Sequence, residues 1–191
     1  MRTQPSPQIL VGQRVGATRS DDHRRGLARA REIPDLLWVP TVVGGLIFLV
    51  GGLGWLVGQP WLFASLGPTA YLLAHSPSQT SARAYNVIVG HVIGLCAAFA
   101  AVTLLGANDA PSVFTTHELV GSRVLASGLA LILAVAVELL VNAPHPPAAA
   151  TVLLITLGGL SISLRSVSVI VIGVLLIVLI GEPLRRLRTA P

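Results

Sequence analysis

The sequence predicts an all-α, polytopic membrane helical bundle, with four full transmembrane helices and two short helices broken by proline. Hydrophobic residues make up 53% of the chain and charged residues only 11%, whereas soluble domains carry about 25% charged residues. Four apolar stretches are long enough to cross a hydrocarbon core of about 30 Å. Two further apolar stretches are shorter and begin around proline. These observations indicate that lipid surrounds most of the chain.

The four long stretches are almost free of charge, which identifies them as full spans. The second carries Asn86 and His91 as its strongly polar residues, and the third carries Glu138 close to its end. Polar and ionisable side chains inside a membrane are functional candidates because their burial in lipid is unfavourable. The predicted spans are Leu36–Val57, Tyr85–Leu105, Val124–Val141 and Ser163–Ile180.

The two short segments are predicted to be re-entrant or discontinuous helices. Trp61–His75 contains Gly67-Pro68, and Ala148–Leu157 follows Pro146 and Pro147. Proline presets a helical φ and suits a helix start. Backbone that is not helical is tolerated at membrane depth only where it is buried in protein or lines a cavity. A helix that begins there presents free N–H groups and the positive end of its dipole, which together attract an anion.

The order of these segments predicts a two-repeat architecture. Each half contains a full helix, a short helix broken by proline, a polar turn with one arginine, and a second full helix. The halves are Leu36–Leu105 and Val124–Ile180, and they align GPTAYLL with PPAAATVLL and Arg83 with Arg165. Transporters often contain such repeats, with discontinuous helices at matching positions forming the binding site.

The distribution of arginine predicts the topology. All 13 basic residues are arginine, and they are concentrated at both ends of the chain. Because cytoplasmic segments are enriched in positive charge, both ends are expected in the cytoplasm, with an even number of crossings. Four crossings with two re-entrant helices and six crossings with two short ones both satisfy this rule. We expect a disordered tail over residues 1–34, a membrane domain over 35–182 and a basic tail over 183–191.

Candidate anion-binding residues cluster at the two breaks. Gly67, Pro68 and Thr69 open the first short helix, and the second opens with His145, Pro146, Pro147 and Ala148. A small anion is expected to bind between these two helix beginnings.

Four polar residues of the neighbouring segments have alternative interpretations. Arg83 either attracts an anion at the mouth of a pore or extends to the lipid headgroups. Asn86 and His91 are five residues apart and so point to different sides of one helix, and His91 is either a permeation residue or an interhelical hydrogen-bond partner. Glu138 shares a helix face with Asn142, close to His145. Glu138 and His145 therefore form a candidate proton-coupling pair, unless Glu138 neutralises a nearby arginine.

Two strings in the sequence resemble the HPP family of small membrane proteins. The first is NAPHPPAAAT, at Asn142–Thr151, and the second is LGPTAYLLAHSPSQTSARAYNVIVGHVIG, at Leu66–Gly94. The resemblance extends over about residues 35–182. Ala149 stands where the family pattern has glycine, and two residues separate Arg83 from Asn86, which are often adjacent. Both departures concern the local geometry of the site. The residues that match the motifs are Gly67, Pro68, Thr69, Arg83, Asn86, Gly90, His91, His145, Pro146 and Pro147.

The resemblance implies a function in transport. Plastid and cyanobacterial members of the family are associated with nitrite transport, which implies a transporter or channel for a small inorganic anion, with nitrite as the leading substrate. The chain is then expected in the bacterial inner membrane. Its expected partners are the lipid bilayer and the anion; a homo-oligomer is left open, and nucleic acid is excluded because no basic and aromatic residues are interleaved.

Two other classes of function remain as alternatives. One is a structural or regulatory membrane subunit that transports nothing and binds a partner through the loop 106–122 or the N-terminal tail. The other is a membrane enzyme, whose signature is a nucleophile–base pair in a cavity that opens to one side. The sequence contains no Gly-x-Ser-x-Gly or phosphate-loop motif, and no histidine pair with metal-ligand spacing. We therefore expect no enzyme, no cofactor and no metal, and we expect Cys96 to be a small buried hydrophobic residue.

Overall fold

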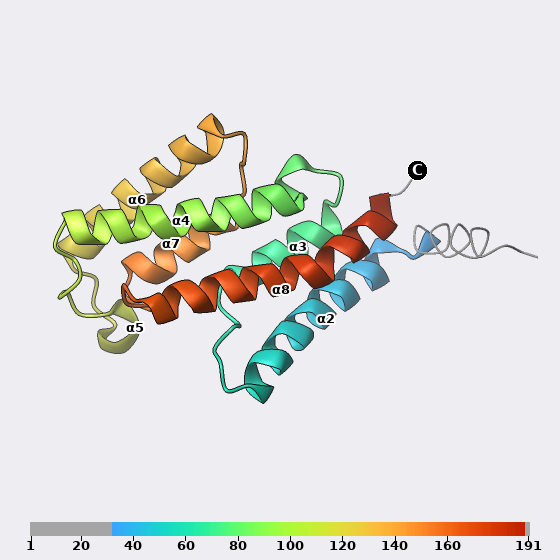
Figure 1. The fold of residues 1–191 in the computed structure, drawn as a ribbon, viewed down its shortest axis with the longest axis horizontal. Helices are drawn as coiled ribbons and strands as arrows, with labels where there is room; N and C mark the ends of the chain where they lie inside the picture. Colours follow the sequence, from blue (N-terminus) through green and yellow to red (C-terminus); the bar gives the residue numbers. More distant parts are fainter. Residues whose placement is uncertain (1–31, 190–191) are drawn as a thin grey trace, which may run out of the picture.

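The computed structural model describes residues 32–189, and in this range all regular secondary structure is helical (Figure 1). Four helices are long and apolar enough to cross a membrane: α2 (Asp35–Leu56), α4 (Ala84–Leu104), α6 (Gly121–Leu140) and α8 (Leu164–Thr189). The short helices are α3 (Leu66–His75), α7 (Ala148–Thr156), α5 (Val113–Thr116) and the 3-10 turn η1 (Thr80–Ala82). The predicted helical bundle of four spans and two short helices is confirmed. Most of the predicted disordered tail, residues 1–31, lies outside the described residues.

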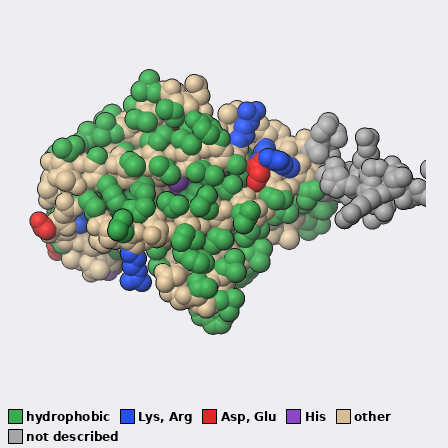
Figure 2. Space-filling view, in the orientation of Figure 1, with side chains coloured by type: hydrophobic (Ala, Val, Ile, Leu, Met, Phe, Trp, Pro, Cys, Tyr) green, Lys and Arg blue, Asp and Glu red, His purple; other side chains and the backbone are tan. Residues whose placement is uncertain are grey.

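The outer surface of the bundle is apolar, as a lipid-facing surface should be. Large hydrophobic side chains point outward on every long helix, including Phe48, Leu104, Leu140 and Leu164, all more than 70% exposed. Figure 2 shows hydrophobic side chains spread over the visible face, with charged groups toward its two ends. Cys96 lies on this outer surface, so the prediction that it is buried was wrong.

The first and last long helices meet at one end of the bundle, which we call the terminal end (Figure 1). Arg188 forms an ion pair with Asp35. Arg185 pairs with Glu182 at 2.7 Å and donates to the carbonyl of Pro77 at 2.7 Å, which brings the turn before α4 to the same end. Helix α8 continues through Pro183 to Thr189, so position 183 is not the start of a separate tail. The opposite end is called the distal end.

The first proline-broken segment runs back from the end of α2 toward the terminal end. Residues 57–65 leave the distal end of α2 without helical structure, and α3 then continues to the terminal end. Both parts lie against α8: a Cβ on Gly173 would be 2.6 Å from the carbonyl oxygen of Trp61, and one on Gly181 would be 2.8 Å from a methyl group of Leu73. Because α8 runs from Gly173 to Gly181 toward the terminal end, the segment 57–75 runs in the same direction.

The second broken segment crosses in the opposite direction, along α4. Tyr85 donates to the carbonyl of Val141 near the terminal end, and Asn86 donates to the carbonyl of Pro144. A Cβ on Gly94 would lie 3.2 Å from a methyl group of Val152. The residues 141–156 therefore run beside α4 toward the distal end.

The chain makes six passes, arranged as two inverted halves of three. Each half contains a long helix, a pass that combines non-helical backbone with a short helix, and a second long helix. Corresponding passes run in opposite directions, as in transporters with inverted repeats. The same interval of 82 residues separates Leu66 from Ala148, at the starts of α3 and α7, and Arg83 from Arg165. The two-repeat prediction thus takes a definite form, with four helices long enough to cross a membrane and a shorter broken pass in each half.

Candidate functional site

Five buried polar side chains meet where the two broken passes become helical. They come from the residue before α3 and its first turn, the middle of α4, the segment before α7, and α7 itself. None is more than 1% exposed. We call them the hydroxyl–imidazole cluster: Ser65, Thr69, His91, His145 and Thr151.

Hydrogen bonds join this cluster across the two halves of the chain. The hydroxyl oxygens of Ser65 and Thr151 are 2.7 Å apart. His91 Nε2 lies 3.2 Å from the Ser65 hydroxyl, and His145 Nε2 lies 3.3 Å from that of Thr69. The two imidazole rings are 4.9 Å apart between centroids. Because each half supplies part of every pair except His91–Ser65, the cluster links the halves at the centre of the fold.

The surrounding carbonyl groups determine where the protons lie. His91 Nδ1 is 2.8 Å from the carbonyl of Val87, and His145 Nδ1 is 2.8 Å from that of Ser81. A carbonyl oxygen only accepts, so each Nδ1 carries a proton and donates it. In the neutral rings each Nε2 is then an acceptor. Ser65 consequently donates to His91 and accepts from Thr151.

Thr69 has one hydroxyl proton and two acceptors within reach. Its oxygen lies 2.9 Å from the carbonyl of Ser65 and 3.3 Å from Nε2 of His145. With neutral His145 the hydroxyl donates to the carbonyl of Ser65, its shorter contact, and the ring nitrogen is a second acceptor at 3.3 Å. With protonated His145 the ring donates to the hydroxyl, which then donates to the carbonyl of Ser65. Thr69 therefore keeps its hydrogen bond to the carbonyl of Ser65 in both cases.

Glu138 holds the backbone just before the prolines of the second break. Its Oε2 accepts from the backbone N–H of His145 at 3.1 Å, and its side chain is buried. Within residues 32–189 no arginine forms an ion pair with Glu138, whose carboxylate instead accepts from the backbone of His145. Asn142 does not share its helix face, because α6 ends at Leu140 and Asn142 has φ of 53°.

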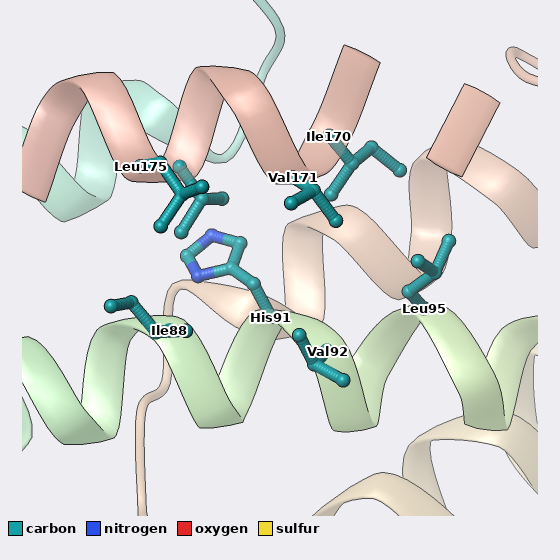
Figure 3. A pocket seen from close by; sticks show the side chains of 8 residues that line it. Ile88, His91, Val92, Leu95, Ile170, Val171 and Leu175 are labelled. Atoms are coloured by element: carbon teal, nitrogen blue, oxygen red, sulfur yellow. The ribbon is translucent and has the colours of Figure 1, made fainter. Parts of the chain in front are cut away.

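Asn86 and His91 lie on different sides of α4, and both are buried because other helices surround α4. This helix contacts α6, α7 and α8. Asn86 reaches the backbone at Pro144, whereas His91 belongs to the cluster. Figure 3 shows the His91 ring directed from α4 toward α8, among Ile88, Val171 and Leu175. His91 thus makes the predicted hydrogen bond between segments and lies at the centre of the candidate site.

The beginning of α7 differs from the prediction of free backbone N–H groups. Pro146 and Pro147 have no N–H, and the next three N–H groups, at 148–150, donate to carbonyls three residues earlier. Helix α3 keeps one such donor: no acceptor among the described residues faces the N–H of Gly67. The donors at the second break are therefore side chains, while the helix dipole still favours negative charge there.

The two proline breaks face each other across a groove of about 740 Å³. Gly67 and Pro68 line one wall, and Pro146 and Pro147 line the other, together with Ser81, whose carbonyl accepts from His145. Ala148 is buried beneath. Arg83 is exposed at the start of α4 and is not part of the cluster. The structure thus brings together every predicted site residue of the two breaks.

Ser65 and Thr151 belong to the site but were not predicted. Single hydroxyl residues are common in membrane helices, so composition does not distinguish them. The repeat could have identified Thr151 as the counterpart of Thr69, because the two are separated by the same 82 residues as the starts of the two short helices. Within the described part of the chain, no three His, Cys, Asp or Glu side chains are placed to hold a metal ion.

The cluster consists of neutral donors and acceptors in a buried position, which suits reversible binding of a small polar or anionic solute. Comparison with known proteins finds a match to the family model of the HPP transmembrane region over residues 29–190. No curated protein matches the chain, and no solved structure does. The matched region contains all six passes, both proline breaks and the hydroxyl–imidazole cluster. The chain therefore belongs to the HPP family of integral membrane proteins.

Proposed function

We propose that this protein is a transporter or channel for a small inorganic anion, with nitrite as the leading candidate. The observation that carries the proposal is the meeting of two inverted, proline-broken passes in one buried cluster of hydroxyl and imidazole groups. Inverted repeats with discontinuous helices at the site are typical of secondary transporters. We further propose the bacterial inner membrane as its location, with both ends of the chain in the cytoplasm.

The cluster supplies the interactions that a small anion needs. The N-terminal ends of α3 and α7 point their positive dipole ends toward it. The hydroxyl groups of Ser65, Thr69 and Thr151 can rotate to donate to an anion, and the free N–H of Gly67 lies at the groove. All cluster side chains are hydrogen-bonded to one another or to backbone carbonyls. An anion therefore binds by replacing the hydrogen bonds between the halves.

Nitrite flux into proteoliposomes tests this function. We expect His145→Ala to lower the flux by about tenfold or more, because the variant removes the ring that joins Thr69 to the turn at Ser81; loss of one such interaction in a transition state reaches this size. His75→Ala, which changes an exposed histidine at the end of α3, is the matched control and should transport normally.

Equal nitrite flux in liposomes with and without the wild-type protein would contradict transport of nitrite. A stoichiometric membrane partner that co-purifies with the inactive protein would then favour a structural or regulatory subunit.

One contact favours a second candidate, an intramembrane hydrolase. The Ser65 hydroxyl donates to His91 Nε2 at 3.2 Å, and the carbonyl of Val87 orients the ring through Nδ1. This is the arrangement of a nucleophile and its general base. Ser65 is fully buried, however, and its oxygen also accepts from Thr151. We therefore propose binding rather than catalysis for this pair.

Labelling with a fluorophosphonate probe distinguishes the two roles of Ser65. We expect the probe to leave the wild-type protein unmodified, because the hydroxyl is sealed within the bundle and shared between two hydrogen bonds. Stoichiometric phosphonylation that Ser65→Ala abolishes would favour the hydrolase.

A further inference from the structure

A buried arginine lies at the distal end of the bundle, far from the terminal cluster of charged residues. Arg123, in the first turn of α6, is 4% exposed. Its guanidinium donates to three backbone carbonyls: Ala110 at 2.6 Å, Thr156 at 3.1 Å and Pro111 at 3.4 Å. No Asp or Glu of residues 32–189 forms an ion pair with it.

This charge is not neutralised by its partners. Buried charges in proteins are normally paired with an opposite charge, because removing an ion from water is strongly unfavourable. The carbonyl of Thr156, at the negative end of the α7 dipole, gives partial compensation. The position of Arg123 at the start of α6 has the reverse effect, since that end of a helix is positive. Asp109 and Glu118, in the loop before α6, form no ion pair with Arg123, so within residues 32–189 the guanidinium has no oppositely charged partner.

The guanidinium borders a polar cavity of about 540 Å³. Its polar lining consists of Thr103, Asn108, Ser112, Ser161 and Arg123, and no acidic residue lines it. A guanidinium has five N–H groups, and the three carbonyl contacts leave two of them available. This combination of an uncompensated cation, hydroxyl and amide donors and an absence of carboxylates suits a small anion.

The backbone around the cavity is shaped to fit the guanidinium. Gly158 has φ of 85°, a conformation that side chains disfavour. A Cβ at this position would also lie 2.8 Å from Nη2 of Arg123 and 3.0 Å from the Cα of Ser112. Glycine thus allows the chain after α7 to close over the arginine.

We propose that this cavity is a distal vestibule in which Arg123 binds the small anion before or after it occupies the hydroxyl–imidazole cluster. Its role in transport rests on the function proposed above, whereas binding at Arg123 stands on the cavity alone. Helix α7 connects the two places, since Thr151 contacts the cluster and Thr156 contacts Arg123. Ile155, which is 1% exposed and lines the cavity, lies between these two residues on α7.

Nitrite binding to the detergent-purified full-length protein tests the vestibule. The dissociation constant is obtained from the rise in thermal unfolding temperature with sodium nitrite, at constant ionic strength balanced with sodium gluconate. All variants are made in the His145→Ala background, which removes a contribution from the central cluster. Each variant is compared with its own nitrite-free baseline, so a loss of intrinsic stability does not imitate a loss of binding.

We expect Arg123→Gln to raise the dissociation constant about tenfold or more, as for the loss of a charge-assisted contact. Arg165→Gln removes the same charge from an exposed position at the distal end and should bind as the parent does. Gly158→Ala, which displaces the guanidinium but keeps its charge, should weaken binding to a smaller extent. If Arg123→Gln does not fold, the nitrite dissociation constants of Gly158→Ala and Arg123→Lys test the proposal in its place.

Nitrite affinity that is unchanged in Arg123→Gln and Gly158→Ala would overturn the vestibule, as would a parent protein that nitrite does not stabilise. Uptake by the wild-type protein with unchanged affinity in these variants would leave transport standing without the vestibule. Arginine-dependent binding in a protein that shows no flux would support the vestibule and contradict transport.

Discussion

Replacing Gly90 with alanine is expected to abolish nitrite uptake and to lower the free energy of unfolding by about 1–3 kcal/mol, the usual effect of overpacking. A Cβ at Gly90 would lie 2.6 Å from the Cβ of His145 and 3.4 Å from Oε1 of Glu138. Both are close to the backbone or to a hydrogen-bonded group, so neither can move aside freely. The new methyl group would separate α4 from the segment before α7 and withdraw His145 from Thr69.

Gly128→Ala is the matched control for this prediction. Gly128 lies in α6, and a methyl group added there would meet no neighbouring atom within 4 Å. Alanine at this position should leave uptake unchanged and stabilise the helix by up to about 1 kcal/mol. Unfolding in mixed detergent micelles and proteoliposome flux measure both effects. Wild-type flux in Gly90→Ala would show that close packing of His145 against α4 is not required.

Two substitutions of Glu138 are expected to separate its structural role from proton coupling. Glu138→Ala leaves the buried N–H of His145 without an acceptor and should destabilise the protein by about 1–3 kcal/mol. Glu138→Gln retains an oxygen that accepts this hydrogen bond but cannot take up a proton. We therefore expect Glu138→Gln to remain folded, to exchange nitrite down its own gradient, and to lose accumulation driven by a pH gradient.

The measurement is nitrite accumulation in proteoliposomes with and without an imposed pH gradient. His75→Ala is a suitable control, because His75 is a titratable residue that is exposed and lies outside the cluster. If the pH gradient drives accumulation equally in wild type and Glu138→Gln, then Glu138 carries no coupled proton and its role is to hold the backbone at His145.

The helices could be predicted from the sequence because their causes are local. An uncharged stretch such as Leu36–Val57 has length and composition that permit little else in a bilayer, and the structure moves its boundaries by one residue. The prolines at 146 and 147 likewise place the start of α7 at Ala148. The direction in which each proline-broken segment runs, and how deep it lies in the bundle, could not be predicted in this way. Both depend on which long helix the segment packs against.

Some site residues were also beyond local inference. Thr69, His91 and His145 were identified because breaks and buried histidines are unusual in a membrane. Ser65 and Thr151 are ordinary residues that become part of the site through a contact between positions 86 residues apart. Arg123 lies at the edge of a predicted span. In the sequence, an arginine that extends to the lipid headgroups and an arginine that is buried beside a cavity look the same at such a position. Only the cavity and the carbonyl partners distinguish the two cases.

The hydroxyl–imidazole cluster also bears on how long a bound anion would stay. Its contacts between segments are hydrogen bonds of hydroxyl and imidazole groups, without an ion pair or a metal bridge among the described residues. Hydrogen bonds between membrane helices contribute about 0.6 kcal/mol each on average, which is close to the thermal energy. Exchange of these hydrogen bonds for hydrogen bonds to a solute is therefore nearly balanced in free energy. Such a balance favours short residence and rapid turnover over tight capture.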